Sequence, residues 1–158
     1  MNAKEYYAYI ENLARRHTLV RHSGNEKHYF RGELEEFYTD LRNRVNFPAV
    51  IAEGFELSYS YGDKTRETSF IIAAAYRGNQ NWPAIYEALD LCERIGDEFL
   101  RRMVADGEEA SVICANIEPL SAVTLLNEQH LYAGIRYTVR ISEAFDETVD
   151  DEQWTDLA

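Results

Sequence analysis

Residues 81–107 read NWPAIYEALDLCERIGDEFLRRMVADG, and this stretch decides the fold. Its apolar side chains recur every three or four residues, which is the spacing of one face of an α-helix. They are Ile85, Ala88, Leu89, Cys92, Ile95, Phe99 and Met103. Asn81 is a suitable N-cap, Pro83 is tolerated in the first turn, and Gly107 is a typical residue at the far end. A helix of about 25 residues is roughly 37 Å long, so we expect it to cross a whole sheet.

Alternating segments on both sides of this helix predict the sheet. Residues 49–61 place Ile51, Phe55, Leu57, Tyr59 and Tyr61 on one face, and residues 65–77 return after a tight turn at 62–64. After the helix, residues 111–117 are rich in β-branched side chains, and Pro119 is expected to bend or end that strand. Residues 122–126 extend it. Residues 131–141 alternate most strictly, with their odd-numbered apolar side chains on one face. We therefore predict two hairpins.

The N-terminal third is predicted to be mainly helical. Residues 3–17 and 33–45 have helical spacing, residues 18–31 are interpreted as a loop or bent extended segment, and Phe47-Pro48 ends the second helix. The resulting prediction is one α+β domain over residues 1–142, in which residues 1–32 form an N-terminal helix and loop. Its mainly antiparallel sheet has about four strands, the central helix lies on one face, and one or two N-terminal helices flank it.

Charge and composition restrict the possible partners. The 158 residues are 46% hydrophobic and carry 16 basic against 28 acidic side chains, a formal net charge of -12. A surface with this charge repels phosphate and anionic headgroups, so we expect neither a membrane nor sequence-specific nucleic acid as partner. The N-terminus has no signal-type apolar core, which favours the cytoplasm. Residues 143–158 include seven acids and no base, which predicts a flexible acidic tail.

The search for a catalytic, cofactor or metal site finds none. His17, His22 and His28 are spaced by five and six residues, and His130 is distant, so no metal-ligand pattern results. Cys92 and Cys114 are interpreted as buried thiols. The acids on the central helix, Glu93, Asp97 and Glu98, lie near Arg94, Arg101 and Arg102 and are expected to form surface ion pairs. No serine elbow or phosphate-binding loop is present. We predict a protein that is not an enzyme.

Exposed aromatic and basic side chains are the candidate interface. If one sheet face is covered by the helix, the other would present tyrosines and arginines to a protein partner. The candidate interface residues are Tyr59, Tyr61, Tyr132, Arg136, Arg140 and Trp154. The alternative is a solvated face whose arginines pair with acids such as Glu56. Trp154, the lone tryptophan of the acidic tail, marks either a docking peptide or a disordered end.

The order of these elements resembles that of small prophage tail-terminator and tail-completion proteins, over about residues 34–142. The marks are Phe47-Pro48 before the first strand, FIIAAAYR at 70–77 leading into the helix, and the closing strand at 137–141. The resemblance implies a non-enzymatic virion-assembly protein without cofactors, which forms homo-oligomeric rings, often hexameric, through sheet edges and long hairpins. Such a phage-related protein would be found in the host cytoplasm or in the virion.

Two other functions remain open. The first is a small-ligand binding module or enzyme with a pocket between the N-terminal helices and the sheet, with His22, His28 and Tyr29 at its mouth. The second is an acidic adaptor or inhibitor whose tail engages a basic partner or mimics nucleic acid.

Overall fold

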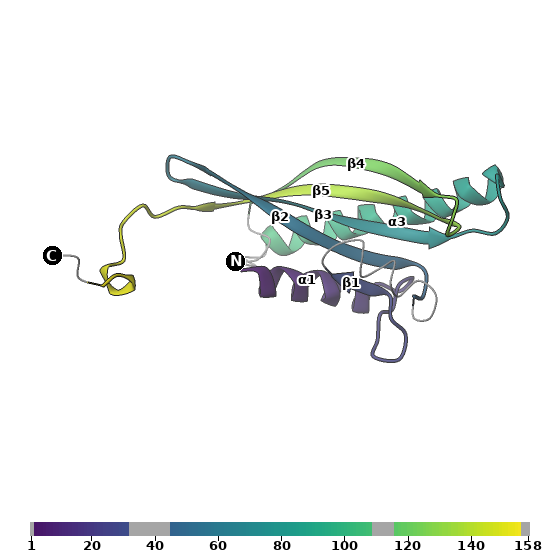
Figure 1. Ribbon diagram of the computed structural model, residues 1–158, viewed down its shortest axis with the longest axis horizontal. Helices are drawn as coiled ribbons and strands as arrows, with labels where there is room; N and C mark the ends of the chain where they lie inside the picture. Colours follow the sequence, from purple (N-terminus) through teal and green to yellow (C-terminus); the bar gives the residue numbers. More distant parts are fainter. Residues whose placement is uncertain (1, 32–44, 109–115, 156–158) are drawn as a thin grey trace.

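The computed structural model describes residues 2–31, 45–108 and 116–155. In this part of the chain, helices α1 (Ala3–Arg16) and α3 (Trp82–Glu108) pack on one five-stranded sheet, giving an α+β fold (Figure 1). A capping box starts α1, in which the side chains of Asn2 and Glu5 each accept the other's backbone N–H. Asn81 caps α3 through the amide of Ala84, as predicted. The helix ends at Glu108, one residue beyond the predicted glycine.

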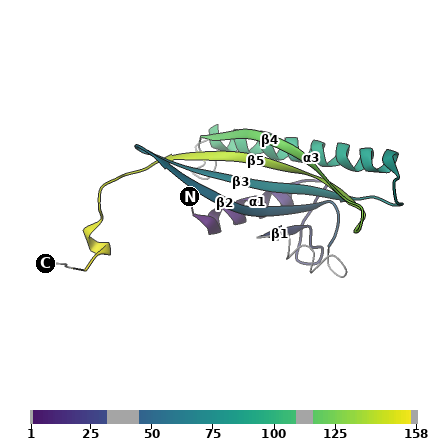
Figure 2. The same cartoon turned by 45° about the horizontal axis from the view of Figure 1, so that its top comes forward.

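The strand order in the sheet is β1-β2-β3-β5-β4. The strands are β1 (Tyr29–Arg31), β2 (Ala49–Ser60), β3 (Asp63–Ala75), β4 (Ile117–Asn127) and β5 (Tyr132–Ala144). The β2–β3 and β4–β5 pairs are the two predicted hairpins, and β3 also pairs antiparallel with β5. Figure 2 shows α3 running along the sheet after β3 and returning the chain to β4, beyond β5.

The predicted number of strands was too low. Residues 29–31, interpreted as part of a loop, form β1, which pairs parallel with β2. The sheet is therefore mixed, although its other strand pairs are antiparallel and it is mainly antiparallel as predicted. Three residues are too few to show a period, and Tyr29 and Phe30 are buried in two different cores made by residues distant in the sequence. The predicted second helix at 33–45 lies almost entirely outside the described residues, as do Cys114 and residues 111–115.

The strands contain two irregularities, of which the one in β2 was not predicted and the one in β4 lies at Pro119, where a bend or an end was expected. A bulge between Ala52 and Phe55 changes the face of β2, so Ile51 and Phe55 lie on opposite sides of the sheet and not on one face. Pro119 does not end its strand, because β4 continues to Asn127 with a register shift between Pro119 and Ser121. Proline is accepted there because β4 is an edge strand.

The main core lies between the helices and one face of the sheet. The buried side chains of α3 are Ile85, Ala88, Cys92, Ile95, Gly96, Phe99 and Met103, in close agreement with the predicted stripe. Beneath them the Phe70 and Tyr137 rings stack with centroids 5.3 Å apart. Gly96 allows this arrangement, because a Cβ atom there would overlap the Tyr137 ring.

Candidate functional site

The edge strand β4 is the most exposed part of the sheet. β5 is its partner on one side, and the other side pairs with no strand of the described residues. Its apolar side chains Leu120, Val123 and Leu126 are 36%, 56% and 43% exposed. Val123 is in register with Arg136 and Leu126 with Ala133, so these two side chains lie on opposite faces of the sheet. β4 therefore offers both apolar side chains and unpaired backbone groups.

Natural edge strands usually carry protection against pairing with other chains, such as lysine, proline, a bulge or short length. β4 has such protection only at its start, where Glu118, Pro119 and the bulge lie. From Ser121 to Leu126 the sequence SAVTLL contains neither charge nor proline. This half of β4 has the properties of a segment that pairs with another strand.

The sheet face opposite the helices carries the predicted arginines in ion pairs. The Nε of Arg136 lies 2.6 Å from Oε1 of Glu53, and its Nη2 donates to Oε2 of the same carboxylate at 3.2 Å, a two-point contact. Arg140 lies 3.7 Å from both Glu67 and Glu118. The expected pairing of these arginines with acids is thus observed, although Glu56 is not among the partners found.

The predicted interface residues do not form one surface. Tyr132 was expected on an open face but is only 4% exposed, and it packs against Phe47 in a second small core. Tyr59 is packed edge-on against Phe145, and its register partner Lys64 lies over its ring. Tyr61 occupies the hairpin turn and is 92% exposed. Trp154 lies in the tail and is exposed.

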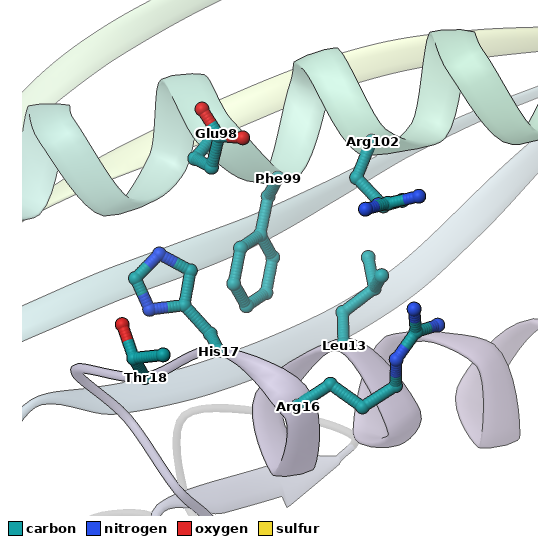
Figure 3. Close-up of a pocket in the computed structure, with 7 residues that line it drawn as sticks. All are labelled: Leu13, Arg16, His17, Thr18, Glu98, Phe99 and Arg102. Atoms are coloured by element: carbon teal, nitrogen blue, oxygen red, sulfur yellow. The ribbon is translucent and has the colours of Figure 1, made fainter.

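A hollow of about 250 Å³ lies between the end of α1 and the middle of α3 (Figure 3). It is lined by Leu13, Arg16, His17, Thr18, Glu98, Phe99 and Arg102. Leu13 and Phe99 form its apolar floor. Figure 3 shows the side chains of Arg16 and Arg102 approaching each other across the opening from opposite helices. The arrangement is a recess with an apolar floor and polar walls, in which two arginines and one glutamate lie.

Burial determines the protonation of two groups near this core. The pKa of His17 is lowered by burial and by Arg94, against the opposing effect of Glu98. Its Nδ1 accepts the amide of Leu19 at 3.1 Å. Burial raises the pKa of the Cys92 thiol to about 12, so Cys92 is the buried, unreactive thiol that the sequence predicted.

A second hollow, of about 430 Å³, lies beside the first helix where the sequence suggested a ligand pocket. Its lining includes Glu11, His22, Lys27, Tyr29 and Arg31; His28 does not line it. His22 accepts the amide of His28 at Nδ1, and its Nε2 lies 3.4 Å from Glu11. His28 is instead buried, with Nδ1 donating to the carbonyl of Pro48.

Among the described residues, no group of three or more His, Cys, Asp or Glu side chains is placed to hold a metal ion. None of the described helices combines the length and apolar character needed to span a membrane.

Comparison with known proteins gives no family: the chain matches no protein-family model and has no significant match among curated proteins.

Sequence reasoning missed the two surfaces that the structure makes most prominent. The exposure of β4 follows from its place at the sheet edge, which no local pattern reveals. The uncharged run at 121–126 was the available signal. The α1–α3 hollow joins residues 13–18 to residues 98–102, and only the tertiary fold brings them together.

Proposed function

We propose that this protein is a structural assembly protein that acts through protein–protein contacts and associates with copies of itself through β4. The carrying observation is the uncharged, exposed half of this edge strand. Pairing with a strand of another copy would satisfy its backbone groups and would partly cover Val123 on one face and Leu126 on the other.

The resemblance to prophage tail-terminator proteins extends this proposal to a ring at the end of a phage tail. Two features support it: a long β2–β3 hairpin with exposed Tyr59 and Tyr61, and an edge strand suitable for contact between neighbours. The net charge of -12 also suits a ring through which DNA passes without binding. Chemistry at an active site has no part in this function.

Light scattering during size-exclusion chromatography tests the self-association. Val123→Lys and Leu126→Lys place a charge on each face of the edge and should weaken association at least about tenfold. Leu19→Lys is the matched control, because Leu19 is also 43% exposed but lies after α1. It should associate like the unchanged chain. A strict monomer at all concentrations, or equal weakening by the control, would contradict the proposal.

Ligand binding is the second candidate, favoured by the polar groups that converge on the hollow beside His22. Lys27 and Arg31 would suit a small anion there. Inorganic phosphate should then raise the melting temperature of the unchanged chain but not of Lys27→Gln/Arg31→Gln. Equal shifts in both proteins would remove this candidate.

A further inference from the structure

The hollow between α1 and α3 carries two arginines at its rim, and the tail carries acids beside an exposed tryptophan, so the two are complementary in charge. We propose that this hollow receives the Trp154 side chain from the tail of a second copy, with the neighbouring tail acids paired to Arg16 and Arg102. This inference rests on the proposed self-association and adds a second contact between copies.

The size of the hollow suits one side chain. Pockets for small molecules and cofactors usually measure about 300–1,000 Å³, whereas this one measures about 250 Å³. Its floor, Leu13 and Phe99, is apolar, and the His17 ring lies 5.7 Å from the Phe99 ring. An indole group entering the hollow would meet aromatic and aliphatic surface, with an imidazole at its edge.

The rim carries two arginines, of which one has a distant carboxylate partner and the other has none among the described residues. Arg16 donates a hydrogen bond to the amide oxygen of Asn12, at 3.4 Å, and within residues 2–31, 45–108 and 116–155 it forms no ion pair with a carboxylate. Arg102 is 3.8 Å from Asp106, and that carboxylate already accepts a hydrogen bond from Tyr9 at 2.6 Å. Glu98, the one acid of the lining, is paired with Arg101 at 3.0 Å. An incoming carboxylate would therefore find two arginines able to bind it.

The tail supplies the matching groups. Trp154 is 67% exposed, and the turn immediately before it (Asp151–Gln153, capped by Asp150) places three acids next to the indole. Large aromatic side chains flanked by charges that match the partner are typical anchors of a peptide contact. No basic side chain of the tail opposes them.

The direction of the tail favours a neighbouring copy over its own hollow. The amide of Phe145 donates to the carbonyl of Gly62 at 2.9 Å, and its ring packs on Tyr59, so the start of the tail is held at the hairpin turn. Figures 1 and 2 both show the following residues leaving the sheet beyond this turn, away from both helices. Nine further residues reach at most roughly 30 Å, which suffices to contact an adjacent molecule.

A labelled peptide tests the contact directly. Fluorescein-labelled peptide 145–155 is titrated with the full-length Trp154→Ala chain, whose own tail lacks the anchor, and binding is followed by anisotropy. Replacing Trp154 by Ala in the peptide should weaken binding at least about tenfold. The control peptide with Val149→Ala, another exposed apolar residue of the tail, should bind within about twofold of the original.

Charge reversal tests the location. The receiver is the full-length Trp154→Ala chain, and adding Arg16→Glu and Arg102→Glu to it should weaken peptide binding at least about tenfold. A peptide with Asp150→Lys and Asp151→Lys should restore binding to this charge-reversed receiver. The control receiver carries Arg15→Glu and Arg77→Glu, which make the same charge change outside the lining and leave the Glu98–Arg101 pair intact. Equal weakening by this control would show general charge attraction and overturn the proposal.

The peptide measurement separates this inference from the function proposed above. A receiver that also carries Val123→Lys should bind the peptide normally, because β4 is not part of the hollow. Self-association without peptide binding would overturn the tail contact alone. If the chain binds the peptide but does not self-associate through β4, the tail contact stands and the assembly through the edge strand is removed.

Discussion

The two faces of the sheet use the same strands but are covered differently. On the helix face, Phe70, Tyr137 and Val139 are almost completely buried beneath α3. On the opposite face, a small core at the β1 side gives way to ion pairs at Arg136 and Arg140 and then to exposed Val123. The first face is complete within one chain. The second, together with β4, leaves apolar surface that a partner can cover.

The largest expected effect tests how closely α3 packs on the helix face. Gly96→Ala places a methyl group into the Tyr137 ring, and displacing that ring would also break its hydrogen bond to the carbonyl of Glu93, now 3.2 Å. We expect the free energy of unfolding to fall by about 3 kcal/mol despite the better helix propensity of alanine. Gly54→Ala, where no atom lies within 4 Å of the new Cβ, is the control. Urea denaturation should show little change for the control, and similar losses in both variants would refute this packing.

A matched pair of valine truncations compares the two faces directly. Val139→Ala, at 0% exposure, should lower the unfolding free energy by about 2 kcal/mol. Val123→Ala, at 56% exposure, should change it by less than about 0.5 kcal/mol when measured on the monomer at low concentration. If Val123→Ala were equally destabilising under those conditions, β4 would already be covered within the single chain.

A smaller effect concerns acid sensitivity on the helix side. Burial and Arg15 lower the pKa of His22 below 6.5, against the opposing hydrogen bond to Glu11. The unfolded chain therefore binds more protons than the folded chain below about pH 6.5. The contribution of neutral His22 to the free energy of unfolding is complete above that pH, and it is lost as the pH falls through the pKa of His22 in the folded chain. His22→Gln should flatten the decline in the urea midpoint between about pH 7 and 5.5. An unchanged decline would exclude His22 as a source of the acid-induced loss of stability.

The smallest effect concerns the ion pair on the opposite face. A double-mutant cycle of Arg136→Met and Glu53→Gln should give a coupling free energy below about 1 kcal/mol, because both side chains remain partly exposed. Raising the salt concentration should reduce it. A coupling of several kcal/mol would mean that this pair is shielded from water, contrary to the partial exposure of both side chains.

Periodic elements were predictable from the sequence, whereas contacts between them were not. The α3 stripe and the alternation of β5 were found because each element has one consistently buried face. β1 has three residues and no period, the β2 bulge reverses the face of Phe55, and Tyr132 is buried by Phe47 from another segment. Each of these outcomes depends on tertiary neighbours.

The candidate site follows the same rule. Pairing of Arg136 and Arg140 with acids was one of two alternatives that the sequence left open, but the partners were not predicted: Glu67 faces Arg140 through strand register, and Glu53 lies in the β2 bulge. Exposure of Trp154 was foreseeable from the acidic tail. The recess between α1 and α3 was not, because its two halves are about 80 residues apart in the chain.

Amide hydrogen exchange of residues 121–126 as a function of protein concentration tests the central claim most directly. If β4 pairs with another copy, its exchange should slow as concentration rises, while that of β5, already paired on both sides, should stay constant. Exchange in β4 that is equally fast in dilute and concentrated protein would contradict assembly through this strand.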